Sequence, residues 1–363
     1  MKIGIVGLPL SGKTTLFNAL TGSRVNTTAF LGGKNEAHHA VVQVPDDRLD
    51  QLVDIFHPKK RTPATIDYID LAGLSTGEQK SHGFSDQFLG QLRTVDAILL
   101  TVRSFDDAAV LHPLDTIDPQ RDLKLAEAEF ILSDLAIIEN RMARLEKQMR
   151  AKKADQDVRE HVLLQKFKNH LENEEPLRKV EIADDEEALV RGYQFLTLKP
   201  QIVVVNIGES DIGRENELSR DFLQTGSNQH TLVLPISAQI EMELQQLSEA
   251  EAETFRRELG IVQSAMSRLI RASYDLLGLI SFLTVGEDDV HAWTIRQNTP
   301  APAAAGAVHS DMERGFIRAE VVSYQEFIQR GSYAKCRADG VLRLEGREYI
   351  VRDGDIINFR FAV

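Results

Sequence analysis

The chain has 363 residues, a formal net charge of −13, 42% hydrophobic residues and 27% charged residues. This length predicts two or three domains with cores of their own, and the composition excludes a disordered or collagen-like chain. The acidic balance excludes nonspecific coating of nucleic acid, so any such contact requires a local basic patch.

The cysteine count and the N-terminus indicate a compartment. Cys336 is the only cysteine, which excludes an intramolecular disulfide and is typical of a reducing environment. The N-terminal MKIGIVGLPLSGKTT has too short and too interrupted an apolar run for a signal peptide. No stretch reaches the roughly 18 apolar residues that span a bilayer. We therefore expect a cytoplasmic monomer without membrane contact.

The first elements along the chain are a β-branched strand at residues 2–6, a glycine-bearing loop and a helix at 14–20. Further strands are predicted at 40–44, 65–69, 97–102, 201–205 and 231–235, with helical patterns between several of them. This alternation predicts an α/β fold with a mostly parallel sheet.

A helical hairpin is predicted in the middle of the chain. Apolar residues at spacings of three and four form a coiled-coil seam: Leu135, Ile138, Met142, Leu145 and Met149. After a charged break at 152–157 a second pattern follows: Val158, Val162, Phe167 and Leu171. The two helices are expected to fold back on each other as an insertion in the α/β domain. The pattern leaves open whether they are a binding surface or only a packed pair.

Residues 282–363 are rich in short strands and turns, which predicts a separate small α+β domain. Within it, the Ala/Pro-rich stretch 300–307 is expected to be a loop or the entry to a helix.

The most specific motif is G-x-x-x-x-G-K-[ST] at residues 7–14, between a predicted strand and a predicted helix. Glycines let backbone N–H groups turn toward phosphate oxygens, and a helix N-terminus favours anions. Lys13 would contact the β- and γ-phosphates, and the Thr14 hydroxyl would hold Mg²⁺. The predicted phosphate-binding residues are Gly7, Leu8, Pro9, Leu10, Ser11, Gly12, Lys13, Thr14 and Thr15.

An acidic residue completes the predicted metal site. Asp70 ends the strand in IDYIDLAG, where a Walker-B carboxylate holds Mg²⁺ through water. Gly73 would offer its backbone N–H to the γ-phosphate. We therefore predict Thr14 and Asp70 as metal-binding residues, and Lys13 and Gly73 as catalytic ones.

The base site is predicted after two later strands, because α/β proteins bind ligands beyond the carboxyl ends of their strands. Asn206, Ile207 and Glu209 follow one of them in VVVNIGES. Guanine-specific proteins usually carry Asn-Lys-x-Asp here, so Ile207 and Glu209 favour a pocket without strict guanine selectivity. Ser237 and Ala238, after the strand TLVLPI, would complete the pocket.

With these motifs the chain resembles the YchF/Obg-like ATPases nearly end to end. The resemblance includes VPDDRLDQLVDIFHPKK, DLAGL, RGYQFLTLKP and the C-terminal AWTI, GFIRAEV and DGDIINFRF. It implies a GTPase-like P-loop NTPase domain of the α/β class, an inserted antiparallel coiled-coil arm and a C-terminal β-grasp TGS domain. The expected boundaries are 1–122 and 196–279 for the NTPase domain, 123–195 for the arm and 280–363 for the TGS domain.

The resemblance also implies a function. It predicts Mg²⁺-dependent binding of ATP, in preference to or together with GTP, and slow hydrolysis to the diphosphate and phosphate. It further predicts a nucleotide-dependent switch associated with the ribosome or RNA through the arm and the TGS domain.

Several positions depart from the family pattern. The family's switch I threonine would fall near Lys34, its hydrolytic histidine at Leu100, and its glycine-rich switch II is altered to STGEQKSHGFSDQF. Leu74 matches the hydrophobic residue that the family carries where many GTPases place a glutamine. His38, His39 and His82 are left without a role, because isolated loop histidines are usually solvated.

Two alternatives remain at this point. The departures at Lys34 and Leu100 favour a nucleotide-binding scaffold that does not hydrolyse. A third interpretation makes the C-terminal block an RNA-binding or small-ligand module, with Trp293 and basic residues on its surface: Arg296, Arg318, Arg343, Arg347 and Arg352.

Overall fold

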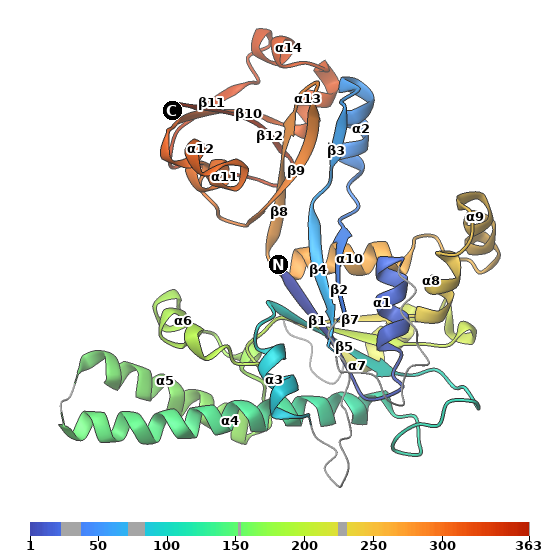
Figure 1. The fold of residues 1–363 in the computed structure, drawn as a ribbon, viewed down its shortest axis with the longest axis vertical. Helices are drawn as coiled ribbons and strands as arrows, with labels where there is room; N and C mark the ends of the chain where they lie inside the picture. The colour runs from blue at the N-terminus through green and yellow to red at the C-terminus, as the bar shows by residue number, and fades with distance from the viewer. Residues whose placement is uncertain (23–37, 72–83, 152–153, 224–230, 363) are drawn as a thin grey trace. The chain divides into compact units, whose positions relative to one another are not determined.

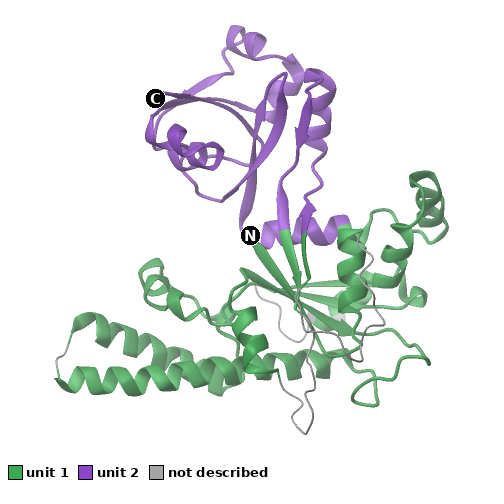
Figure 2. Ribbon diagram, in the orientation of Figure 1, with its two compact units in different colours: residues 1–40, 67–266 green, residues 41–66, 267–363 purple. Residues whose placement is uncertain are grey.

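The structure, a computed structural model, describes residues 1–22, 38–71, 84–151, 154–223 and 231–362. The chain divides into two compact units (Figure 2): residues 1–40 with 67–266, and residues 41–66 with 267–363. Helices and strands are labelled in Figure 1.

The first unit is built on a sheet in the order β2-β4-β1-β5-β6-β7. Its strands are β1 (Lys2–Val6), β2 (His38–Gln43), β4 (Thr65–Asp70), β5 (Ala97–Arg103), β6 (Gln201–Asn206) and β7 (Thr231–Ile236). From β4 to β7 all neighbouring pairs are parallel. Every residue of β5 and β6 is buried, as expected for central strands covered on both faces. The predicted α/β sheet is confirmed.

Helices surround this sheet. They are α1 (Lys13–Thr21), α3 (Asp86–Leu92), α7 (Glu215–Leu223), α8 (Ala238–Leu244) and α9 (Glu249–Glu258). The next helix, α10 (Ala265–Leu276), belongs from Ser267 onward to the second unit. A short 3-10 turn, η3 (Glu209–Asp211), follows β6. The starts of α3 and α9 carry serine caps, Ser85 and Ser248, whose hydroxyls accept from backbone N–H groups of the first turn.

The arm consists of α4 (Pro119–Ala151) and α5 (Asp155–Glu172), followed by η1 (Leu177–Lys179), α6 (Asp184–Val190) and η2 (Arg191–Tyr193). Ile138, Met142 and Leu145 are buried along α4 as predicted. The prediction for Val162 is wrong, because 63% of it is exposed and Leu163 and Leu164 are buried in its place. Both faces of a short apolar run satisfy a helical period, and only packing decides which face turns inward.

The second unit contains a mixed sheet in the order β11-β10-β12-β8-β9-β3. Its strands are β3 (Lys60–Thr62), β8 (Leu279–Val285), β9 (Asp289–Arg296), β10 (Phe316–Ser323), β11 (Arg343–Glu345) and β12 (Asp355–Phe361). Its helices are α2 (Asp47–Phe56), α11 (Ala301–Val308), α12 (Ser310–Arg314), α13 (Tyr324–Arg330) and α14 (Tyr333–Ala338). The stretch 300–307 is therefore mostly helical, and Trp293 packs against the core of this unit.

Residues 41–66 belong to this second unit although they lie far upstream in the chain. β3 pairs in parallel with β9, and the Phe56 ring stacks on Phe327. Arg48 Nη1 donates to Asp353 Oδ2 at 2.7 Å. The contacts thus group this segment with the C-terminal sheet, whereas the boundaries expected from the sequence placed it in the NTPase domain.

Candidate functional site

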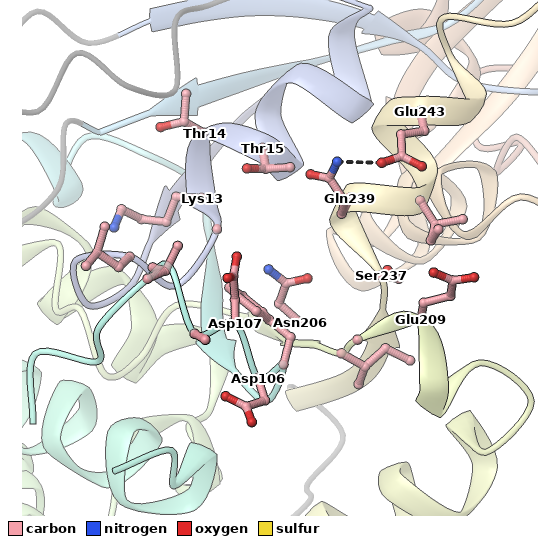
Figure 3. A pocket seen from close by; sticks show the side chains of 18 residues that line it. Lys13, Thr14, Thr15, Asp106, Asp107, Asn206, Glu209, Ser237, Gln239 and Glu243 are labelled. Carbon is pink, nitrogen blue, oxygen red and sulfur yellow. Dashed lines mark hydrogen bonds between the residues drawn. The ribbon is translucent and has the colours of Figure 1, made fainter. Parts of the chain in front are cut away.

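A cavity of about 730 Å³ lies in the first unit, beyond the carboxyl ends of its parallel strands (Figure 3). Four chain segments line it: the loop after β1, the segment after β5, the loop after β6 and the start of α8. This is the edge at which open α/β sheets bind ligands. The predicted site residues in its lining are Leu10, Gly12, Lys13, Thr14, Thr15, Asn206, Ile207, Glu209 and Ser237.

The loop after β1 requires its two motif glycines. Gly12 has a φ of 92°, and a Cβ there would lie 2.1 Å from Asn206 Nδ2. A Cβ on Gly7 would lie 2.3 Å from the Thr101 carbonyl oxygen. No side chain fits either position, because such contacts are far inside van der Waals distance. Leu10, at the tip, also has a positive φ of 62°. The loop is therefore held in a strained turn that brings its backbone close to the cavity.

Lys13 and Thr14 line one end of the cavity, and Asp70, which is not part of the lining, contacts Thr14. The Thr14 hydroxyl donates to Asp70 Oδ2 at 3.2 Å, and Lys13 Nζ donates to the Leu8 carbonyl at 2.8 Å. Burial lowers the pKa of Lys13 to about 8, and the negative charge of Asp70 opposes the shift. Burial also raises the pKa of Asp70, opposed by Lys13. With a pKa of about 8, Lys13 keeps most of its positive charge at neutral pH, and a polyanion such as a triphosphate would stabilise that charge further.

The donor set at this end fits Mg²⁺. Asp70 Oδ1 is buried and has no hydrogen-bond partner within the described residues. A buried carboxylate oxygen without a partner is costly unless a ligand or water completes it. The Thr14 hydroxyl beside it adds a second hard oxygen, the ligand type that Mg²⁺ prefers. Gly73, predicted to face the γ-phosphate, lies outside the described residues, as do Lys34, Leu74 and His82.

Asn206 braces two walls of the cavity. Its Nδ2 donates to the Ser11 carbonyl at 3.0 Å, and its Oδ1 accepts from the Ala238 N–H at 3.1 Å. Both ends of the buried amide are therefore engaged with the backbone, which ties the phosphate loop to the start of α8. The second bond occupies the Ala238 N–H, so Ala238, which was predicted to complete the base pocket, does not line the cavity with a free N–H. Asn206 thus shapes the pocket rather than presenting a free edge to it.

The other end of the cavity is lined by Ile207, Glu209, Ser237 and two residues of α8, Gln239 and Glu243. Figure 3 shows Glu209 and Ser237 on the side of the cavity away from Lys13. Gln239 Nε2 donates to Glu243 Oε1 at 2.6 Å. This end offers an apolar surface with carboxylate, amide and hydroxyl groups around it, the composition expected of a pocket for a planar heterocycle.

One wall of the cavity was not predicted from the sequence. The segment after β5, with Phe105, Asp106, Asp107, Ala108 and Val110, lines the cavity. The available signal was that this segment follows a largely apolar strand of the parallel sheet, as do the segments that contain Asn206 and Ser237. No motif marks this segment. Its residues can be assigned to the cavity only once β5 is known to lie between β1 and β6.

The placement of the family's hydrolytic histidine at Leu100 is wrong. Leu100 is buried in the middle of β5, where it pairs with Val6 and Val203, and is 1% exposed. It belongs to the hydrophobic core of the sheet. A side chain at this position cannot reach a nucleotide, so leucine there is no argument against hydrolysis.

Comparisons with known proteins agree with this architecture. A family profile for a 50S ribosome-binding GTPase matches residues 2–120. A profile for the C-terminal domain of YchF GTPases, described as a protein of unknown function, matches residues 279–362. The ribosome-binding ATPase YchF of Bacillus subtilis is 40% identical over 368 residues, which cover 100% of both chains. The chain belongs to the YchF family.

Other YchF relatives cover the same extent. Obg-like ATPase 1 of rice, Oryza sativa subsp. japonica, is 36% identical over 100% of this chain and 92% of its own length. The solved structure of the Schizosaccharomyces pombe YchF GTPase superposes with a TM-score of 0.86 at 33% identity, covering 99% of this chain and 97% of the other. The chain is therefore a P-loop NTPase with the YchF domain composition. Among the described residues, no helix is both long and apolar enough to span a bilayer.

Proposed function

We propose that this chain binds ATP with Mg²⁺, accepts GTP less well, and hydrolyses the nucleotide slowly as a switch on the ribosome. The observation that carries the proposal is that Lys13 and Thr14 line one end of a 730 Å³ cavity, with Asp70 hydrogen-bonded to Thr14. A cavity of this size accommodates a nucleoside triphosphate.

Binding of the triphosphate would follow from the phosphate loop. Backbone N–H groups at the start of α1 and the Lys13 ammonium would neutralise the phosphates. Mg²⁺, held by the Thr14 hydroxyl and through water by Asp70, would supply charge neutralisation at the β- and γ-phosphates. The chain's own contribution to hydrolysis is then electrostatic, from groups fixed before the nucleotide arrives.

Base selectivity would follow from the opposite end. Glu209 carries its carboxylate one methylene farther from the backbone than the aspartate of guanine-specific pockets, which displaces it from the two guanine N–H donors. Phe105 and Ile207 add apolar surface against which a purine can lie. These features support ATP over GTP.

Association with the ribosome is supported by the relatives, which are named ribosome-binding ATPases. The arm offers a long solvated helical pair, α4 and α5, with exposed apolar side chains such as Leu132 and Val162. Exposed apolar groups on a charged helical arm are suited to a partner surface.

Calorimetric titration of the full chain with Mg-ATP, Mg-GTP and their non-hydrolysable analogues tests binding, and phosphate release from the same preparation tests hydrolysis. The proposal expects tighter ATP binding and slow release that is lost in Lys13→Ala. Binding without release above background would support the scaffold interpretation instead. Co-sedimentation with 70S ribosomes, with and without nucleotide, tests the switch, and equal sedimentation in all states would refute it.

The non-hydrolysing scaffold loses one of its two sequence arguments. Leu100 is a core residue, so it does not mark a missing catalytic group. The remaining argument, Lys34, lies outside the described residues.

A further inference from the structure

Arg103 is a buried arginine directly behind the nucleotide cavity. It ends β5 and is 2% exposed, yet no carboxylate forms an ion pair with it within the part of the chain that the structure describes. Burying a guanidinium is costly, so its hydrogen bonds have to compensate for lost water. Its partners therefore indicate what it does.

The two partners of Arg103 belong to the cavity segment after β5, and its Nη1 has no hydrogen-bond partner within the described residues. Arg103 Nε donates to the Phe105 carbonyl at 3.1 Å, and Nη2 lies 3.5 Å from the Asp107 carbonyl. The guanidinium carbon sits 4.4 Å from the centre of the Phe105 ring. One planar side chain thus binds the backbone of the segment at two points and stacks on the aromatic ring between them.

Phe105 in turn spans the two loops that enclose a nucleotide. A Cβ on Gly12 of the phosphate loop would lie 3.9 Å from Phe105 Cε1, and a Cβ on Gly208 of the loop after β6 would lie 3.7 Å from Phe105 Cβ. The Ser104 N–H donates to the Asn206 carbonyl at 2.8 Å, which fixes the start of the segment. Displacing the ring would therefore open the cavity wall near the base end.

We infer that Arg103 is a positioning residue that fixes Phe105 and the following backbone as the wall against which the nucleoside of ATP packs. Arg103 itself does not line the cavity, so it acts through Phe105 and touches neither phosphates nor metal. The inference rests on the proposed nucleotide binding. Arg103 then contributes to the affinity of the chain for the nucleoside part of ATP and not to its affinity for the phosphates.

Two probes separate these parts: Mg-ATP, and Mg-tripolyphosphate, which lacks base and ribose. In the full-length chain, Arg103→Met keeps a long apolar stem and removes the guanidinium, and Arg103→Lys keeps the charge and removes the planar fork. We expect Arg103→Met to weaken ATP binding by about 10-fold or more and tripolyphosphate binding by no more than about 2-fold. In Arg103→Met the KM for ATP should rise while kcat stays the same. The ATP affinity of Arg103→Lys should lie between those of the unaltered chain and Arg103→Met.

A matched control is Arg178→Met, which removes another buried arginine of the same unit, paired with Glu127 at 2.7 Å outside the nucleotide cavity. It should lower the thermal midpoint without changing the ratio of the two affinities. Equal losses for both probes in Arg103→Met, or unchanged ATP binding, would overturn the inference. If Arg103→Met does not fold, Phe105→Leu gives the same readout, and unchanged ATP affinity there also overturns it. If the unaltered chain binds neither probe, the proposed function itself fails.

Discussion

The two ends of the nucleotide cavity are built in different ways. The proposed phosphate end is one continuous loop and helix start within residues 7–15, and Asp70 of β4 contacts it through the Thr14 hydroxyl. The base end is assembled from three segments that follow β5, β6 and β7 and are far apart in the sequence. Changes at the phosphate end should therefore affect every nucleotide alike, whereas changes at the base end should affect discrimination between nucleotides.

The largest effect is expected for Lys13→Ala. It removes a buried cation next to the phosphates, so kcat for ATP and for GTP should both fall by about 10²–10³. Phosphate release measures this. Lys199→Ala is the control, because burial lowers the pKa of Lys199 to about 8 as well, while its Nζ donates to the Val95 carbonyl away from the cavity. A loss restricted to one nucleotide would contradict the separation of the two ends.

Gly12→Ala should have the next largest effect. The new Cβ adopts a strained φ and meets Asn206 at 2.1 Å, so the free energy of unfolding should fall by about 3 kcal/mol. Gly213→Ala is a matched control, since Gly213 has a φ of 90° and no atom within 4 Å of the added Cβ. It should lose only about 1 kcal/mol. Urea unfolding compares them, and equal losses would show that the clash with Asn206 is relieved without cost.

Asn206→Ala tests the brace between the two ends. It leaves the Ser11 carbonyl and the Ala238 N–H without their buried partner, which should cost about 2 kcal/mol of stability. Because it loosens both ends, affinities for Mg-ATP and Mg-tripolyphosphate should fall together. A titration in which only ATP weakens would assign Asn206 to the base end alone.

A pH experiment tests the lowered pKa of Lys199, the buried lysine that lies away from the cavity. The pKa of Lys199 is lowered to about 8 by burial, below the value near 10.5 of an unfolded chain, so between these values the unfolded state binds more protons. Stability should then rise with pH across this window. Lys199→Met should remove about 1 kcal/mol of that rise, a value discounted for partial solvent access. Unfolding at pH 7 and pH 9.5 measures it, and parallel curves for both proteins would contradict the prediction.

The smallest effect is expected for Glu209→Asp at the base end. The shorter carboxylate should regain contact with the guanine edge and shift the ratio of GTP to ATP affinity by about 3-fold toward GTP. The affinity for tripolyphosphate should not change. Glu243→Asp, on the same lining, controls for a general effect of shortening a carboxylate, and an equal shift there would remove the special role of Glu209.

The elements that could be predicted from sequence are those whose signal is local. The strand, loop and helix around Lys13, the apolar strands β5 and β6, and the helical periods of α4 and α5 appear within single windows of the chain. Local patterns also placed Asp70 and Asn206 at strand ends. They could not tell Val162 from Leu163 as the inward face of α5, because both fit a helical period.

Only the tertiary structure decided how segments that are distant in the sequence contact one another. The segment 41–66 contributes β3 and α2 to the C-terminal sheet, since strand pairing with β9 and the stacking of Phe56 on Phe327 are nonlocal. The amide of Asn206 is satisfied by the phosphate loop and the start of α8. Phe105 became a cavity residue, and Arg103 its buried neighbour, only once β5 lay between β1 and β6. Leu100 was excluded from the site for the same reason, because its strand is central and buried on both faces. The sequence by itself determined the loop and helix start at residues 7–15, whose groups are neighbours in the chain, whereas the order of strands in the sheet decided which side chains line the opposite end of the cavity.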